Sequence, residues 1–124
     1  MSNQCQQLQI DEVYINGVLE AFEEKSASIE NPTGWDNEGV ASAMGDHGTR
    51  RKRTVPMLKY KLMTGASFDI NKYGNLDLVE ITVRDAVTQR RGRIARASYA
   101  TMNDLGGGEN PEVKWILNSP IQWL

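Results

Sequence analysis

The sequence of 124 residues predicts a single, mainly β domain: an antiparallel β-sandwich or barrel with one short flanking α-helix. Three observations support this prediction. Short segments alternate apolar and polar residues with a period of two, and clusters of Gly, Pro, Asn and Asp separate these segments. Only one stretch of the chain has helical spacing. We therefore expect one domain over residues 1–124, with a long loop at 31–53.

The N-terminal part predicts two strands of different character. "VYINGVLE" (13–20) alternates with period two, and its Asn16-Gly17 pair indicates a bend or a bulge. Residues 22–30 also alternate, but few of them are apolar. We expect this second strand to have one face in water or against a partner.

The segment that follows predicts a loop. Residues 31–48 are rich in turn formers and show neither the strand nor the helix period. With the basic run that comes next, the loop extends to residue 53. A loop of this length is uncommon in a compact domain and usually has a function.

The middle of the chain predicts a strand and then the helix. Residues 53–63 place Leu58, Tyr60 and Leu62 on one phase, as expected of a buried face. In "GASFDINKYGN" (65–75) the apolar residues fit two helical turns, which the second glycine would end.

The C-terminal part predicts a hairpin and a last strand. "LDLVEITVRD" is the most β-prone segment, "AVTQRRG" is expected to be the turn, and "RIARASYATM" the returning strand. A glycine-rich loop then leads to one strand over residues 113–124. In that strand Trp115 shares a phase with Val113 and Leu117, so we expect it in the core.

The charges are unevenly placed, although the net charge is only −2. Acidic residues crowd residues 11–30, whereas cations crowd residues 50–61 and 84–96. Separate zones of opposite sign on a nearly neutral chain suggest electrostatic attraction between copies. The residues expected in an inter-subunit contact are Trp35, Arg50, Arg51, Lys52 and Arg53, with Glu20, Glu23, Glu24 and Glu30 as possible acidic counterparts.

The run Arg50–Arg53 has several interpretations. It can be a solvated junction between loop and strand, a contact with an acidic neighbouring copy, or a nuclear targeting signal. A small nucleic-acid-binding β-barrel module would use it together with Arg90–Arg93, but aromatic residues for stacking are otherwise missing nearby and only Tyr60 is close. Trp35 lies in a polar segment, so we expect it to dock on the domain or on another copy.

Residues with catalytic or metal-binding chemistry are sparse. The only histidine, His47, lies in the loop segment "GDHG", which has a glycine at each end. Neither His47 nor Cys5 has a recognised ligand spacing. The glycines of "GGG" lack the Lys-Ser/Thr of a phosphate loop. We therefore expect no enzyme activity, no metal and no cofactor. A lone Cys5 can at most cross-link two copies.

The sequence contains no apolar run long enough for a membrane span and begins without a signal-peptide core. We accordingly expect a protein that is made and kept in the cytosol and has no membrane partner.

The order of these segments resembles that of the tail tube proteins of contractile-tailed bacteriophages and the related secretion-system tube proteins. The resemblance covers nearly the whole chain. It is carried by "VYING", the polar second strand, the long loop ending in basic residues, the hairpin "VEITVRDAVTQRRGRIARASYA" and the turn "LGGGENPEVKW".

The resemblance implies a structural virion protein. Six copies would form a ring whose strands join into one β-barrel, and rings would stack into the tail tube through which DNA passes without specific binding. The loop at 31–53 would reach the adjacent ring. Tail sheath, tape-measure and baseplate or terminator proteins are the implied partners, with assembly in the host bacterial cytoplasm.

Overall fold

The computed structural model describes residues 8–64, 71–74, 78–103 and 105–124. These residues are mainly strand. The strands are β1 (Ile10–Ile15), β2 (Val18–Leu19), β3 (Ser28–Glu30), β4 (Trp35–Val40), β5 (Gly48–Arg53), β6 (Met57–Lys61), β7 (Val79–Asp85), β8 (Arg91–Met102), β9 (Glu112–Leu117) and β10 (Ile121–Trp123). The expected all-antiparallel β architecture is confirmed.

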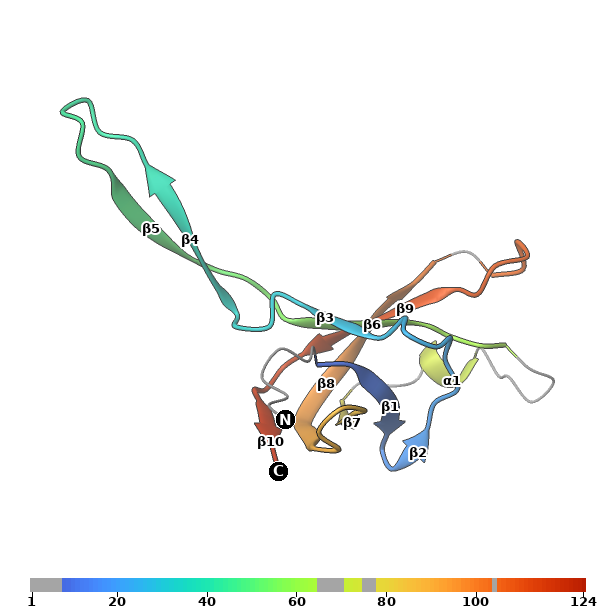
Figure 1. The fold of residues 1–124 in the computed structure, drawn as a ribbon. Helices are drawn as coiled ribbons and strands as arrows, with labels where there is room; N and C mark the ends of the chain where they lie inside the picture. Colours follow the sequence, from blue (N-terminus) through green and yellow to red (C-terminus); the bar gives the residue numbers. More distant parts are fainter. Residues whose placement is uncertain (1–7, 65–70, 75–77, 104) are drawn as a thin grey trace.

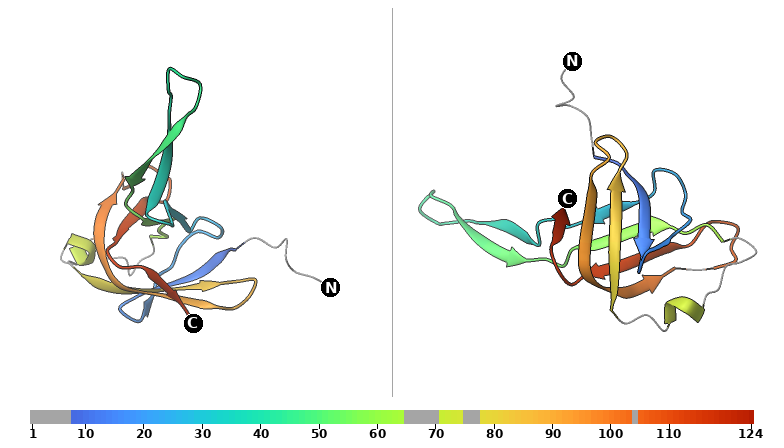
Figure 2. Two further views of the ribbon diagram at one scale, coloured as in Figure 1. Left: turned by 90° about the vertical axis from the view of Figure 1, so that its left-hand side faces the viewer. Right: turned by 90° about the horizontal axis from the view of Figure 1, so that it is seen from below.

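One long strand, β8, joins two layers of sheet. The strand order is β2-β1-β7-β8-β9-β6-β3, and β10 also pairs with β8. Residues at the start of β8 pair with β7 and β10, whereas its second half pairs with β9. Figure 2 shows β8 curving from one layer into the other. The described strands form an open sandwich whose sheet does not close into a barrel.

The core lies between these layers and follows the alternation of the strands. Leu58 and Tyr60 of β6 are fully buried, and Leu62 is 3% exposed, so the predicted buried phase is confirmed. Trp115 is fully buried between Val113 and Leu117, and its indole N–H donates to the Tyr60 hydroxyl at 3.1 Å. The other layer contributes the remaining buried aliphatic residues, Ile10, Val13, Ile15, Val79, Ile81, Val83 and Ile94.

Two tight turns fix the strand register of the layer that contains β2, β1, β7, the start of β8 and β10. Asn16 and Gly17 both have positive φ values, 51° and 83°, as the two central residues of a type I′ hairpin turn require. The predicted bend at this pair is thus the turn between β1 and β2. At the other end, the carboxylate of Asp85 organises the turn from β7 into β8.

Several sequence-based expectations are wrong in detail. The flanking helix is not supported: the described residues contain only one helical turn, α1 (Asn71–Gly74), and residues 65–70 and 75 of the expected segment lie outside them. The last strand is divided into β9 and β10, because Pro120 lies in the break between them. The polar strand over 22–30 is reduced to β3.

The largest correction concerns the loop at 31–53. Residues 35–53 form a hairpin of β4 and β5, here called the arm, which projects from the body of the domain (Figure 1). Every residue of its two strands is exposed. With neither face buried, the arm lacks the apolar alternation by which strands are recognised in a sequence.

Candidate functional site

The arm is joined to the body through a short base, residues 31–34 and 54–56, which is held by backbone hydrogen bonds. The N–H of Gly34 donates to the Asn31 carbonyl, and the N–H of Thr54 donates to the Gly34 carbonyl, both at 3.0 Å. Gly34 has a φ of 76°, which favours glycine. Because β3 and β6 continue directly from this base, the direction of the arm is set by the layer that contains them.

The pairing register of the arm assigns its side chains to two faces. Residues directly opposite each other in an antiparallel pair point to the same side of the sheet. The partners Asp36↔Lys52 and Glu38↔Arg50 therefore lie on one face, here called the paired face. Trp35↔Arg53 and Asn37↔Arg51 lie on the other, here called the Trp–Arg face.

The paired face balances its own charge. It carries two carboxylates and two cations, and Lys52 lies 3.6 Å from Glu38 along the diagonal. Cross-strand pairs of opposite charge stabilise a hairpin by a few tenths of a kcal/mol up to ~1 kcal/mol. These pairs support the hairpin and leave little net charge on this face.

The Trp–Arg face has cations and no carboxylate. The guanidinium carbon of Arg51 lies 3.9 Å from the centroid of the Trp35 ring, and that of Arg53 lies 4.8 Å from it. Cation–π contact holds both guanidinium groups on the indole, which remains 37% exposed. The expectation that only Tyr60 is near the basic run is therefore wrong.

Two of the four expected acidic counterparts are engaged within the chain. Glu20 is only 6% exposed and accepts from the Tyr73 hydroxyl at 2.6 Å and from Lys72 at 3.2 Å. Glu30 forms an ion pair of 2.8 Å with Lys59, which lowers the pKa of the Glu30 carboxyl. Both carboxylates are thus already engaged by cations of their own chain.

Glu23 and Glu24 remain exposed at one end of the body. The amide of Asn110 donates to Glu23 at 3.4 Å, which brings the exposed Glu109 into the same region. We call Glu23, Glu24 and Glu109 the acidic end. The N–H of Glu23 donates to the carbonyl of Lys61, at the end of β6 remote from the arm. In Figures 1 and 2 the β8–β9 loop and the arm likewise lie on opposite sides.

The second cluster of arginines is largely satisfied. Arg93 forms an ion pair of 2.9 Å with Glu80, which lowers the pKa of that carboxyl, and Arg84 contacts Glu12 at 3.0 Å. Arg90 and Arg91 lie 5.7 and 5.9 Å from the ring centroids of Trp123 and Tyr14. These arginines do not adjoin the arm to form one continuous basic surface with it.

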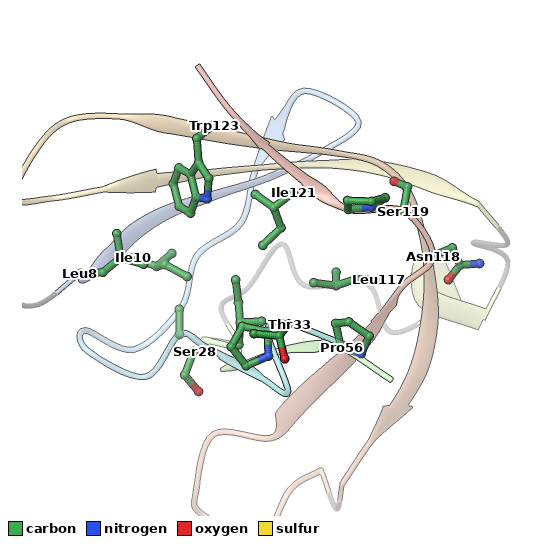
Figure 3. Close-up of a pocket in the computed structure, with 14 residues that line it drawn as sticks. Leu8, Ile10, Ser28, Thr33, Pro56, Leu117, Asn118, Ser119, Ile121 and Trp123 are labelled. Atoms are coloured by element: carbon green, nitrogen blue, oxygen red, sulfur yellow. The ribbon is translucent and has the colours of Figure 1, made fainter. Parts of the chain in front are cut away.

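An apolar groove of about 690 Å³ lies at the open side of the sandwich (Figure 3). Ile10, Leu117, Ile121 and Trp123 line it together with Pro56 of the arm base. The described lining has no ionisable side chain.

Among the residues that the structure describes, the side chains with catalytic or metal-binding chemistry are not brought together. His47 lies at the tip of the arm, where its Nδ1 accepts from the N–H of Ser42 at 3.2 Å, and Cys5 lies outside the described residues. Among the described residues, no three His, Cys, Asp or Glu side chains gather as a metal site would require. No helix in the described part of the chain is long and apolar enough to cross a membrane.

Comparison with known proteins reveals similarity at the level of the fold. No protein-family model and no curated protein matches the sequence. Five chains of solved structures match. One is the tube-terminating cap of the anti-feeding prophage, determined by cryo-EM, which covers 100% of this chain and 99% of its own, with a TM-score of 0.53 at 10% identity. At that identity the likeness shows a shared fold.

Proposed function

We propose that this protein is a structural subunit of a phage-type tail, which assembles with copies of itself into rings that stack as a tube. The main support for this proposal is the arm. It is a hairpin of two six-residue strands, exposed throughout, that adds nothing to the core of its own domain. The fold shared with a tube-terminating cap supports a tail-associated role.

The sheet edges support lateral contacts within a ring. In the described part of the chain, β2 pairs only with β1 and β10 only with β8. These strands lie at opposite edges of one layer, and Val18 and Leu19 of β2 are each 56% exposed. Exposed edges of this kind pair readily with another chain. A β2 edge meeting the β10 edge of a neighbour would continue the sheet from copy to copy.

The finer features of the proposal are a hexameric ring, a channel for DNA delivery, and location in the virion tail. Tail sheath, tape-measure and baseplate or terminator proteins are the proposed partners. The role is non-enzymatic and needs no cofactor. The arm would contact an adjacent ring, because it extends away from the layer whose edges would form the ring.

Negative-stain electron microscopy of the purified chain over a range of concentration and salt tests this function. We expect rings, and tubes if the protein is a tube subunit rather than a cap; single rings alone would favour the cap role. A protein that stays monomeric under all conditions, including in the presence of a sheath or terminator partner, would refute the proposal.

Trp35 favours a second candidate, a nucleic-acid-binding module. An aromatic ring beside two arginines is a combination that stacks bases and neutralises phosphates. Such binding would weaken steeply with salt. A gel shift with single- and double-stranded DNA at low salt measures it, and the absence of any shift removes this candidate.

A further inference from the structure

The arm is asymmetric in a way that composition does not reveal. The run Arg50–Arg53 looks like one basic patch in the sequence, but strand geometry sends alternate residues to opposite faces. On the paired face Arg50 lies opposite Glu38 and Lys52 lies opposite Asp36, whereas Arg51 and Arg53 lie opposite the uncharged Asn37 and Trp35. Only Arg51 and Arg53 therefore give their face a net positive charge that a partner can meet.

The Trp–Arg face is organised for binding carboxylates. A guanidinium group presents a planar fork of N–H donors that matches a carboxylate, and stacking on an aromatic ring limits its rotation. Arg51 and Arg53 are both held in this way on Trp35. Partly exposed Trp and Arg are also the residues that most often dominate binding energy in protein interfaces.

The same chain carries a surface of complementary charge. The acidic end presents Glu23, Glu24 and Glu109, with Lys25 as the cation within these segments. Lys61, at the nearby end of β6, is paired in register with Glu112. The segments 23–25 and 109–110 thus have a formal charge of −2, against +2 for the Trp–Arg face.

We propose that the Trp–Arg face of one copy docks on the acidic end of a second copy. The two surfaces lie at opposite ends of the body (Figure 1), so a chain cannot satisfy both by itself. A contact between different surfaces of identical chains is head-to-tail, and it extends into rings or filaments according to its rotation. This inference rests on the proposed function and specifies the contact within it.

Matched pairs of substitutions test the docking contact. R51Q/R53Q and R50Q/K52Q remove the same number of charges from the same strand but from opposite faces. We expect R51Q/R53Q to raise the concentration needed for assembly roughly thirtyfold or more, whereas R50Q/K52Q stays within roughly threefold of wild type. Light scattering and sedimentation velocity measure the assembly, and circular dichroism checks that each variant is folded.

A charge exchange tests the partner surface. R51E/R53E should not assemble, E23R/E24R should not assemble, and the chain carrying all four changes should recover assembly, because its two surfaces remain complementary. Equal assembly of R51Q/R53Q and R50Q/K52Q would overturn the inference while leaving the proposed function intact.

Two further outcomes separate the alternatives. Absence of assembly by the wild-type chain would refute the proposed function itself. If R51Q/R53Q instead abolished binding to DNA and left assembly unchanged, the Trp–Arg face would be a nucleic-acid site and the docking contact would be refuted.

Discussion

Asp85 controls the turn between β7 and β8, and its removal gives a sharp test of the fold. The side chain is 1% exposed, and its carboxylate accepts four hydrogen bonds. The backbone N–H groups of Gln9 and Val87 donate to Oδ1, at 3.0 and 3.1 Å, and the N–H and hydroxyl of Thr88 donate to Oδ2, at 3.2 and 2.6 Å. In D85N the second oxygen becomes an NH2 group, which cannot accept from Thr88.

Two routes give a similar magnitude for D85N. Hydrogen bonds to a charged group contribute about 1.5–3 kcal/mol each, so losing the two from Thr88 should cost about 3 kcal/mol or more. Independently, the hydroxyl of Thr88 and the N–H of Gln9 lower the pKa of Asp85 from 3.8 to about 2. At about 1.4 kcal/mol per pKa unit, this shift corresponds to about 2 kcal/mol of folding free energy.

The sign of the pH dependence follows from the lowered pKa. The folded state binds the proton more weakly than the unfolded state, so the contribution of Asp85 is complete above pH 3.8 and is lost as pH falls through about 2. The difference in unfolding free energy between wild type and D85N should therefore shrink by about 1 kcal/mol between pH 6 and pH 3, and by about 2 kcal/mol at pH 2.

Urea denaturation at each pH measures this difference, at a protein concentration where sedimentation shows a monomer. D46N is the matched control, because Asp46 is exposed at the tip of the arm. It should change the unfolding free energy by less than about 0.5 kcal/mol. A D85N effect that is equally large at pH 6 and pH 3 would contradict the linkage, and a negligible effect at pH 6 would refute the role assigned to the turn.

Three further changes test the packing. G92V should lower the unfolding free energy by about 1–3 kcal/mol in thermal denaturation, because a Cβ at Gly92 would lie 3.0 Å from Ile121 and 3.1 Å from the Trp123 ring; unchanged stability would mean that β10 is not packed there. Y60F leaves the buried indole N–H of Trp115 without its acceptor and should cost about 1–3 kcal/mol, and a cost near zero would contradict that hydrogen bond. Replacing the arm by two glycines should leave the melting temperature within about 3 °C, since the arm buries nothing in the body, whereas a large loss would show that it contributes to folding.

The sequence was sufficient to predict those strands in which burial of one face makes apolar residues recur with a period of two. Leu58, Tyr60 and Leu62 alternate with polar residues because one face of β6 packs in the core, and the same holds for Trp115 in β9. Local turn chemistry was also informative, since Asn-Gly predicts a change of direction at residues 16–17. These features depend on neighbours in the chain or on the simple distinction between inside and outside.

Features that depend on distant partners could not be predicted. In the sequence Glu20 is one of several acidic residues in the segment 11–30, but the Tyr73 hydroxyl that binds it comes from 53 positions further along the chain. The arm was missed because neither of its faces is buried. Its division into two faces required the register, and with it the knowledge that Trp35 lies opposite Arg53.

Strand β8 has a mechanical consequence. The arm is attached to β3 and β6, in one layer, whereas the unpaired edges β2 and β10 belong to the other. Among the hydrogen-bonded strands described, only β8 belongs to both layers, through β9 on one side and β7 and β10 on the other. A pull on the arm would therefore reach the far layer partly along this strand and partly through the core packed between the layers, so β8 would carry a share of the tension on the subunit.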